Sequence, residues 1–552
     1  MTQTVASVVG SVLAGLGVGH AFGVVGSGNF HVTNALRAHG VPFTAARHEG
    51  GAACMADGYG RLAARPAVLS VHQGCGLTNA MTGITEAAKS RTPMIVLAAD
   101  TAAAAVNSNF RVDQDGLAAS VGAVAERVHS PASAIADVTR AYKIATQGRR
   151  TVVMSLPLDV QAAPLDPALP VTALAGAGTP VPAGPAPARP ASSAIDDLAA
   201  LLAVAERPVF IAGRGGRGAG PAIAALAGRA GALLATSAVA NGLFAGDEFN
   251  LGISGGFATP LAAELIASAD LIVGWGCALN MWTTRHGTLL GPAARVVQVD
   301  DDLAALGTHR PLDLGVLGDC GATAADALDA LKESRAGYRR PEISALLAHG
   351  RWWNDVATAD LSAAGRIDPR EFSKALDRAL PAERVVSVDS GNFMGYPSAY
   401  LRVPDERGFC FTQAFQSVGL GLASGIGAGL AQPGRLPVIA TGDGGFLMGV
   451  AELETAVRLG RPMLVAVYND AAYGAEVHHF GAGTDLGAVT FPDSDIAAIA
   501  RGFGAAGVTV RAPHDMAAVQ AWALNPAGVL VVDAKIASDG GSWWLAEAFR
   551  GH

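Results

Sequence analysis

The stretch LPVIATGDGGFLMGVAELETAVRLGRPMLVAVYNDAAYGAE, residues 436–476, decides the fold. It begins with an apolar strand, Leu436–Thr441, and turns at Gly442-Asp443-Gly444-Gly445. A helix pattern with one apolar face follows, and a second apolar strand, Leu464–Tyr468, ends at Asn469-Asp470. A strand, a helix and a strand in this order predict two parallel strands joined by a crossover helix.

Two carboxylates follow the ends of these strands, Asp443 and Asp470. The glycines Gly442, Gly444 and Gly445 allow backbone N–H groups to approach a phosphate at the start of a helix. Carboxylate oxygens suit a hard cation such as Mg²⁺ or Ca²⁺. The stretch therefore predicts a metal-assisted diphosphate site, and its structural alternative is a surface turn beside an unrelated acidic loop.

The composition of the whole chain sets the frame for this motif. A length of 552 residues, half of them apolar and 16% charged, supports about three domains with sizeable cores. With 39 Lys and Arg against 47 Asp and Glu, the net charge of −8 provides no basic face for nucleic acid. The five cysteines show no CxxC spacing, which indicates neither zinc nor disulfides and fits a reducing cytoplasm.

Composition also divides the chain into three blocks, residues 1–165, 190–335 and 368–552. A Pro/Ala/Gly connector containing PVPAGPAPARPASS lies within 164–193, and a softer, polar boundary covers 333–370. Each block alternates β-branched runs with Ala/Leu helical patterns, which predicts three open, mostly parallel α/β sheets. The expected strands are Val68–Val71, Ile95–Ala98, Val152–Leu156, Val209–Ala212, Leu271–Gly274, Val296–Val299, Val385–Val388, Val438–Thr441, Leu464–Tyr468 and Val529–Val532.

The uncharged stretch 6–26 could be mistaken for a signal peptide or a membrane span. No Lys or Arg precedes it, and several glycines and His20 interrupt it. We therefore expect a packed helix followed by a buried strand, and no membrane partner.

The Gly-Asp-Gly turn followed by Asn469-Asp470 resembles the diphosphate motif of thiamin diphosphate (ThDP) enzymes. The resemblance covers nearly the whole chain and follows the acetohydroxyacid synthase, benzoylformate decarboxylase and pyruvate decarboxylase branch. It implies a pyrimidine-binding, a central and a diphosphate-binding domain, in that order. It also implies metal ligation of Mg²⁺ (or Ca²⁺ or Mn²⁺) by Asp443, Asp470 and the backbone carbonyl of Ala472. The family usually has Asn where this chain has Asp470, and the extra charge bears on metal preference.

RHEGGAACMADGYGR, residues 47–61, resembles the family segment that carries the activating glutamate, here Glu49. In the family that carboxyl protonates N1′ of the aminopyrimidine, so that N4′ can remove the C2 proton. The alternative for Glu49 is an acidic residue that only favours a helix start. The cofactor contacts implied by the resemblance are Glu49, Gly391, Asn392, Phe393, Gln416, Val418, Gly442, Asp443, Gly444, Gly445, Asp470, Ala472 and Tyr473.

Four further positions match catalytic residues within the branch. Ser27 and His72 match a serine and a histidine of benzoylformate decarboxylase, Glu476 matches a glutamate of pyruvate decarboxylase, and Gln114 matches a glutamine of acetohydroxyacid synthases. His72 and Glu476 are the expected proton-transfer pair. The structural alternatives are a core histidine, a turn serine, and a Glu476 that pairs with a neighbouring histidine.

The central block contains IAGRGGRGAG, residues 211–220, and a strand that ends at Asp300. Such a loop could hold an ADP or coenzyme A moiety, although packing alone is the simpler reading. FAD is not expected, because residues 276–287 lack the R-F-D-D-R pattern that accompanies it in the family.

Together these features predict a ThDP- and Mg²⁺-dependent lyase or carboligase that decarboxylates a 2-oxo acid through an enamine. The alternatives are an acetolactate-synthase-like transferase, a 2-hydroxyacyl-CoA lyase acting on an acyl-CoA-type substrate, and a non-catalytic ThDP-fold scaffold. The resemblance implies a homodimer or homotetramer, in which the domain carrying Glu49 faces the partner's diphosphate-binding domain. The C-terminal GSWWLAEAFRGH is expected to be either a mobile lid or a docked helix.

Overall fold

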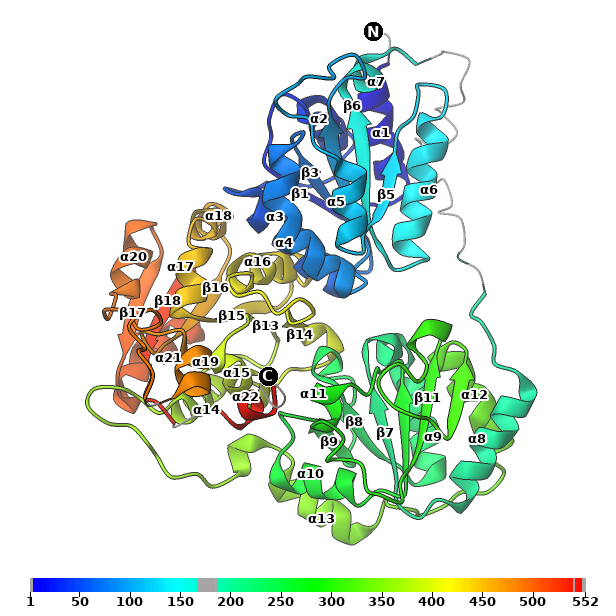
Figure 1. The fold of residues 1–552 in the computed structure, drawn as a ribbon. Coiled ribbons are helices and arrows are strands. Elements are labelled where there is room, and N and C mark those ends of the chain that lie inside the picture. Colours follow the sequence, from blue (N-terminus) through cyan, green and yellow to red (C-terminus); the bar gives the residue numbers. More distant parts are fainter. Residues whose placement is uncertain (1–2, 166–183, 185, 482, 540–541, 549–552) are drawn as a thin grey trace.

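The computed structural model describes residues 3–165, 184, 186–481, 483–539 and 542–548 (Figure 1). It contains three six-stranded sheets, and every pairing between named strands is parallel. We call the units around these sheets domain 1 (blue to cyan), the central domain (green) and domain 3 (yellow to red). The predicted α/β class is confirmed, and every strand predicted above is present. Most of the proline-rich connector lies outside the described residues.

In domain 1 the strand order is β2-β1-β3-β4-β6-β5. The strands are β1 (His20–Gly23), β2 (Phe43–Ala45), β3 (Ala67–Val71), β4 (Met94–Asp100), β5 (Val124–Arg127) and β6 (Thr151–Pro157). The helices are α1 (Val5–Gly15), α2 (Phe30–Ala38), α3 (Glu49–Leu62), α4 (Cys75–Lys89), α5 (Gln114–Ser120), α6 (Ala134–Thr146) and α7 (Leu158–Ala162). Helix α1 and strand β1 account for the uncharged N-terminal stretch, as predicted. No helix among the described residues is both long and apolar enough to cross a membrane.

In the central domain the strand order is β12-β11-β10-β7-β8-β9. The strands are β7 (Pro208–Ala212), β8 (Leu233–Thr236), β9 (Asn250–Ile253), β10 (Leu271–Trp275), β11 (Arg295–Asp300) and β12 (Leu314–Leu317). The α-helices are α8 (Ser192–Val204), α9 (Gly220–Ala230), α10 (Pro260–Ala267), α11 (Met281–Thr284), α12 (Cys320–Ala330) and α13 (Pro341–Gly350).

In domain 3 the strand order is β14-β13-β15-β16-β18-β17. The strands are β13 (Arg384–Val388), β14 (Phe409–Phe411), β15 (Leu436–Gly442), β16 (Met463–Asn469), β17 (Ala506–Val510) and β18 (Val529–Lys535). The α-helices are α14 (Pro369–Ala379), α15 (Gly395–Tyr400), α16 (Gly421–Ala431), α17 (Asp443–Met448), α18 (Glu452–Arg458), α19 (Gly474–Phe480), α20 (Ile496–Gly502), α21 (Met516–Leu524) and α22 (Trp543–Ala548). The single helix expected after the Gly-Asp-Gly turn is two helices, α17 and α18. They separate at Gly449, where a Cβ would lie 3.1 Å from the Gly419 carbonyl oxygen.

Helices α3 and α16 pack backbone against backbone and join domain 1 to domain 3 (Figure 1). A Cβ on Gly58 would lie 2.1 Å from the Ser424 carbonyl oxygen, and one on Gly427 would lie 2.0 Å from that of Met55. Only glycine fits at these two positions. The glycine pattern of α16 is therefore a packing requirement, and it fixes the position of α3 over domain 3.

The C-terminal helix α22 is docked between domain 3 and the central domain. Trp544 is fully buried, meets the ring of Tyr396 edge-on at 4.9 Å, and donates through Nε1 to the Asn392 carbonyl at 3.0 Å. Trp543 stacks on Trp353 at 4.6 Å and donates to the Gly256 carbonyl at 2.6 Å. Of the two expectations for this segment, the structure shows the docked helix; residues 540–541 lie outside the described residues.

We expect Trp544→Ala to destabilise the protein by about 3–5 kcal/mol, because it empties a fully buried aromatic site. Thermal unfolding measures the loss. Leu524→Ala is the control, since Leu524 is 89% exposed and its removal should change stability by less than about 0.5 kcal/mol. Equal melting temperatures for the two variants would show that α22 is not docked.

Candidate active site

The carboxyl ends of β13, β15 and β16 gather the residues predicted to hold the cofactor. These strands are neighbours in the sheet, β13 beside β15 and β15 beside β16. Strand β13 leads to the turn 391–393, β15 leads to Gly442 and Asp443, and β16 leads to Asp470. Ligands of open α/β sheets bind at this edge.

Asp443 is buried and Asp470 is half-buried, and their carboxyl groups lie close enough to interact directly. Burial raises the pKa of Asp443, and burial together with the neighbouring Asp443 raises the pKa of Asp470 to about 7. Two neighbouring carboxylates that are largely withdrawn from water are costly unless a proton or a cation neutralises them. This donor set fits a hard divalent cation. Among the described residues no cluster of three or more His, Cys, Asp or Glu side chains is placed to hold a metal, so backbone carbonyls would complete such a site.

Glycines leave no room for side chains around the acidic pair. A Cβ on Gly474 would lie 2.2 Å from Asp470 Oδ2, and one on Gly445 would lie 2.5 Å from Asp389 Oδ2. A Cβ on Gly444 would lie 2.9 Å from the Tyr473 ring. The turn therefore presents backbone rather than side chains, which fits close approach by a diphosphate.

Gln416 and Val418 lie in the loop that connects β14 to α16. Val418 reaches towards the same turn, since a Cβ on Gly445 would lie 3.4 Å from its methyl group. Asp389, fully buried at the end of β13, accepts hydrogen bonds from the N–H groups of Gly419 and Leu420, and burial raises the pKa of this carboxyl to about 6. The domain 3 residues that were predicted to bind the cofactor therefore lie in turns and loops at the same edge of the sheet.

Glu49 is the first residue of α3 in domain 1. Its half-buried carboxylate accepts a hydrogen bond from Asn79 Nδ2 at 3.1 Å. Just before it, the backbone N–H groups of Arg47 and His48 donate to the buried carboxylate of Glu452 at 3.1 and 2.9 Å. Glu452 comes from α18 of domain 3 and holds the start of α3. Sequence reasoning missed Glu452, which looks like an ordinary acidic residue at a helix start.

His72 and Ser27 lie close together in domain 1. His72 Nδ1 accepts a hydrogen bond from the Gly28 N–H at 3.2 Å, and the His72 ring meets Phe110 edge-on at 5.2 Å. Ser27 is exposed in the turn beside this contact. Gln114 is buried instead and donates to Ser155 Oγ at 3.3 Å, so its side chain points into the domain.

Glu476 lies on α19, six positions after Asp470. The side chain is half-buried and makes no hydrogen bond or ion pair within the described chain, so the pairing with a neighbouring histidine is not observed. This leaves its carboxyl open to a ligand at the edge of the sheet.

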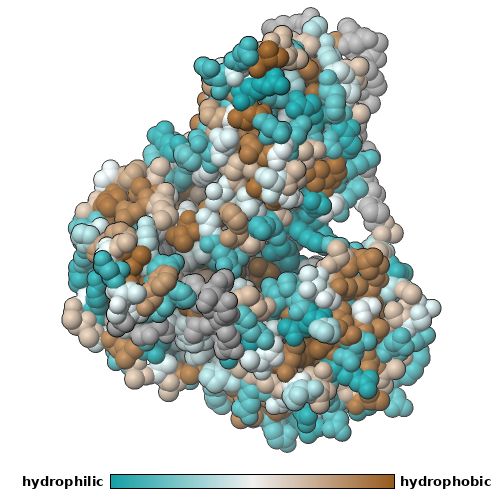
Figure 2. Space-filling model, in the orientation of Figure 1, coloured by the Kyte–Doolittle hydropathy of each residue, from teal (hydrophilic) through white to brown (hydrophobic). Residues whose placement is uncertain are grey.

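The predicted site residues form two groups, one in domain 1 and one in domain 3. In the described ranges, no hydrogen bond or ion pair joins Glu49 or His72 to the turn around Asp443 and Asp470. Both groups are accompanied by exposed apolar side chains, and Figure 2 shows hydrophobic residues gathered in several patches over these domains. These side chains are Val25, Phe30, Val106, Phe110 and Val112 in domain 1, and Phe415, Val418, Leu447, Met448, Tyr473 and Phe480 in domain 3.

A cavity of about 810 Å³ lies where the three domains meet. In Figure 2 the surface recedes between the upper domain 1 and the central domain at the lower right. The predicted glycine loop lines the cavity through Gly213 and Arg214, and Asp300 lies on the same wall. Arg214 makes no hydrogen bond or ion pair within the described chain, and burial lowers its pKa to about 10. The ADP or coenzyme A moiety expected here stays a prediction.

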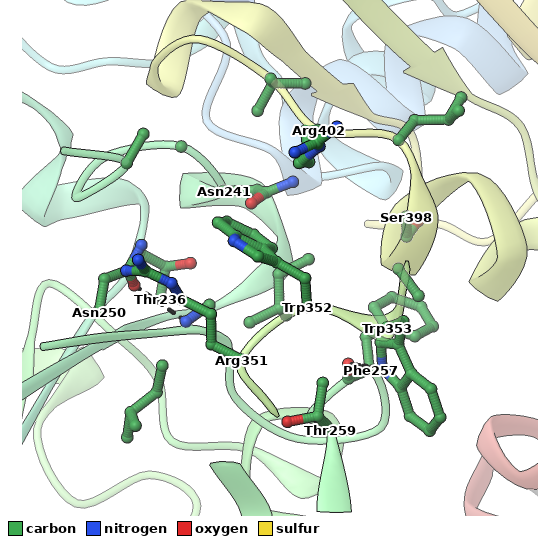
Figure 3. Close-up of a pocket in the computed structure, with 18 residues that line it drawn as sticks. Thr236, Asn241, Asn250, Phe257, Thr259, Arg351, Trp352, Trp353, Ser398 and Arg402 are labelled. Carbon is green, nitrogen blue, oxygen red and sulfur yellow. Dashed lines mark hydrogen bonds between the residues drawn. The ribbon is translucent and has the colours of Figure 1, made fainter. Parts of the chain in front are cut away.

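A second, smaller cavity separates the central domain from α15 (Figure 3). Trp352 and Trp353 project into this interface between Asn241 and Phe257. Its volume is about 30 Å³, enough for about one water molecule. It therefore belongs to domain packing and not to the chemistry of the site.

Comparison with known proteins identifies the family. Thiamine pyrophosphate enzyme domains match the chain in the order of the fold: the N-terminal TPP binding domain over residues 3–120, the central domain over 195–331 and the C-terminal TPP binding domain over 389–534. Three parallel-sheet domains with this acidic turn define the class of thiamin-diphosphate-binding enzymes. The chain belongs to the thiamine pyrophosphate (thiamin diphosphate) enzyme family.

Its relatives carry several activities within that family. The chain is 32% identical to the probable 2-ketoarginine decarboxylase AruI of Pseudomonas aeruginosa, over 93% of this chain and 90% of that protein. It is 30% identical to a sulfoacetaldehyde acetyltransferase of Rhodobacter capsulatus, over 86% and 83%. It is 29% identical to an acetolactate synthase of Bacillus subtilis, over 96% and 93%.

We expect Asp443→Ala to weaken Mg²⁺-dependent ThDP binding by about 100-fold or more, because removal of an outer-shell partner of a metal already costs about 10–100-fold. Isothermal titration calorimetry measures the affinity, and melting of the cofactor-free protein shows whether the fold survives. Asp485→Ala, which removes an exposed loop carboxylate of the same domain, should bind as the native protein does. If Asp443→Ala bound ThDP and Mg²⁺ with native affinity, Asp443 would not be a metal ligand.

Proposed function

We propose that the protein is a ThDP- and Mg²⁺-dependent lyase that decarboxylates a 2-oxo acid without oxidation. The observation that carries the proposal is the pair formed by Asp443, buried, and Asp470, half-buried, beside the glycine turn at the ends of β15 and β16. The decarboxylase named among the relatives supports the same reaction class. When bound, ThDP supplies a carbon nucleophile that adds to a carbonyl and accepts the electron pair left by departing CO₂.

The residues of the chain take separate roles in this proposal. Asp443, Asp470 and the Ala472 carbonyl would hold Mg²⁺, and Gly391, Asn392, Phe393, Gly442, Gly444, Gly445 and Tyr473 would surround the diphosphate. Gln416 and Val418 would hold the aminopyrimidine ring. Glu49 would exchange a proton with N1′ of that ring.

Glu476 and His72 are proposed to move protons at the substrate. The alanines around Glu476 and the exposed ring of Phe480 would exclude water once the site is covered. Ser27, exposed beside His72, would orient the substrate. Gln114 would need to leave its buried contact with Ser155 to take part, so its role rests on the resemblance alone.

Dimerisation would complete the site, because within the described chain no hydrogen bond or ion pair joins Glu49 to the diphosphate turn. A second copy related by a two-fold axis would place Glu49 of one subunit over the turn of the other, at two equivalent sites.

Light scattering should therefore show a homodimer or a homotetramer at assay concentrations. An active monomer would contradict this arrangement.

Two glutamate variants should separate two stages of the reaction. Glu49→Gln should slow exchange of the ThDP C2 proton and overall turnover by about 10²–10⁴-fold, since it removes one acid–base group. Glu476→Gln should leave C2 exchange close to native but lower turnover by a similar factor. NMR of C2 exchange and a CO₂ assay measure the two stages. Normal turnover in Glu476→Gln would make Glu476 structural and leave His72 as the main candidate.

Carboligation or acyl transfer is the second candidate, supported by the acetolactate synthase and sulfoacetaldehyde acetyltransferase among the relatives. A screen of the ThDP- and Mg²⁺-loaded protein with 2-oxo acids, aldehyde acceptors and 2-hydroxyacyl-CoAs decides between them. Release of CO₂ with an aldehyde supports the lyase, and a condensed product supports the transferase. Cleavage of a 2-hydroxyacyl-CoA without release of CO₂ would contradict both candidate functions and support a 2-hydroxyacyl-CoA lyase.

A further inference from the structure

Glu86 is a buried carboxylate that the proposed chemistry does not use. It lies on α4 of domain 1 and is 1% exposed. One carboxylate oxygen accepts a hydrogen bond from the Ala414 N–H at 3.0 Å, and the other accepts one from the Phe415 N–H at 2.6 Å. Both amides belong to domain 3, in the loop 412–420 that precedes α16. A side chain of domain 1 thus holds the backbone of a domain 3 loop.

Arg61 extends this contact. Its guanidinium lies 2.6 Å from the Glu86 carboxylate, pairs with Asp57 at 2.8 Å, and donates to the Phe411 carbonyl at 2.7 Å. Burial acts to raise the pKa of Glu86, but Arg61 and the two backbone N–H groups outweigh it and lower that pKa. Glu86 is therefore ionised at neutral pH, and its hydrogen bonds are of the strong, charge-assisted kind.

The loop held by Glu86 contains a strained residue. Gln416 has a φ of +63°, in the left-handed region that non-glycine residues rarely adopt. Such a conformation persists only where the surroundings fix it, and it is concentrated at functional sites. Glu86 fixes the backbone before Gln416, the Ser390 hydroxyl donates to the Gln416 carbonyl at 3.2 Å, and Asp389 accepts from the N–H groups that follow.

We propose that Glu86 is a positioning residue that holds Gln416 in the left-handed conformation and so aims its carbonyl, and the neighbouring Val418, at the aminopyrimidine ring. This role rests on the proposed function, which assigns Gln416 and Val418 to that ring. Glu86 makes no hydrogen bond or ion pair with Asp443 or Asp470. Its loss should therefore disturb the ring while leaving the metal and diphosphate contacts in place.

The first test needs no cofactor. Hydrogen–deuterium exchange of the ThDP-free protein, resolved over residues 411–416, should show slow exchange at Ala414 and Phe415 in the native chain. Glu86→Gln keeps the size of the side chain but replaces one acceptor oxygen with a donor, so these amides should exchange about 10- to 100-fold faster. The proposal would be overturned if these two amides in the native protein exchanged as fast as those of an unstructured peptide. It would also be overturned if their exchange rates were the same in Glu86→Gln as in the native protein. The first outcome is measured on the native protein alone and does not depend on whether the variant folds.

The second test uses ThDP- and Mg²⁺-saturated protein. Glu86→Gln should slow exchange of the C2 proton by about 10- to 100-fold, because a small displacement of a reacting group is costly, while Mg²⁺ affinity stays native. Asp377→Asn is the matched control: Asp377 is a buried carboxylate that pairs with Arg384 and accepts the Arg402 N–H. It should change neither the Ala414 and Phe415 amides nor C2 exchange.

Two outcomes of the second test would overturn the role of Glu86. Native C2 exchange in Glu86→Gln would make Glu86 purely structural, and equally slow exchange in Asp377→Asn would attribute the effect to general destabilisation. Failure of the native protein to bind ThDP would instead overturn the proposed function, and this role with it. The amide exchange of the first test would still report whether Glu86 holds the loop.

Discussion

Domain 1 and domain 3 can pack as they do only because α3 and α16 touch backbone to backbone. Gly58 and Gly427 stand where any side chain would collide with a carbonyl oxygen of the opposite helix. A methyl group at either position would push the helices apart, and the carboxylates that cross this interface would then lose their partners. Glu452 could not reach the start of α3, and Glu86 could not reach the loop before α16. Both contacts that bear on the site depend on this close approach.

Carboxylates serve two opposite purposes in this molecule. Glu86, Glu452 and Asp389 are buried and accept hydrogen bonds from backbone N–H groups, and Glu86 also pairs with Arg61, so each connects two segments of the chain. Asp443, which is buried, and Asp470, which is half-buried, lie beside one another, an arrangement that costs free energy until a cation or a proton neutralises the charge. The first kind stabilises the fold, and the second is the pair that we propose as metal ligands.

The sequence predicted most of the central strands, and missed the edge strands and the short central strand β8. Strands β3, β4, β10, β13, β15, β16 and β18 are continuous buried apolar runs, which is the pattern that sequence reasoning detects. The edge strands β5, β12 and β17 are partly exposed, and β14 has only three residues, so their sequences carry no comparable signal. The strand-end residues of the site were predictable for the same reason, because ends of neighbouring parallel strands converge. Glu452 and Glu86 were not, since they lie 405 and 328 residues from the backbone groups they bind.

The last elements of the chain also set an order of assembly. Strand β18 lies between β16 and β17 in the domain 3 sheet, and α22 joins domain 3 to the central domain through Trp543 and Trp544. A chain is synthesised from its N-terminus, and its domains fold as units in that order. Domain 1 and the central domain can thus form their sheets on the ribosome, whereas the domain 3 sheet waits for residues 529–535. The part of the contact between domain 3 and the central domain that Trp543 and Trp544 make can form only after those residues have been synthesised.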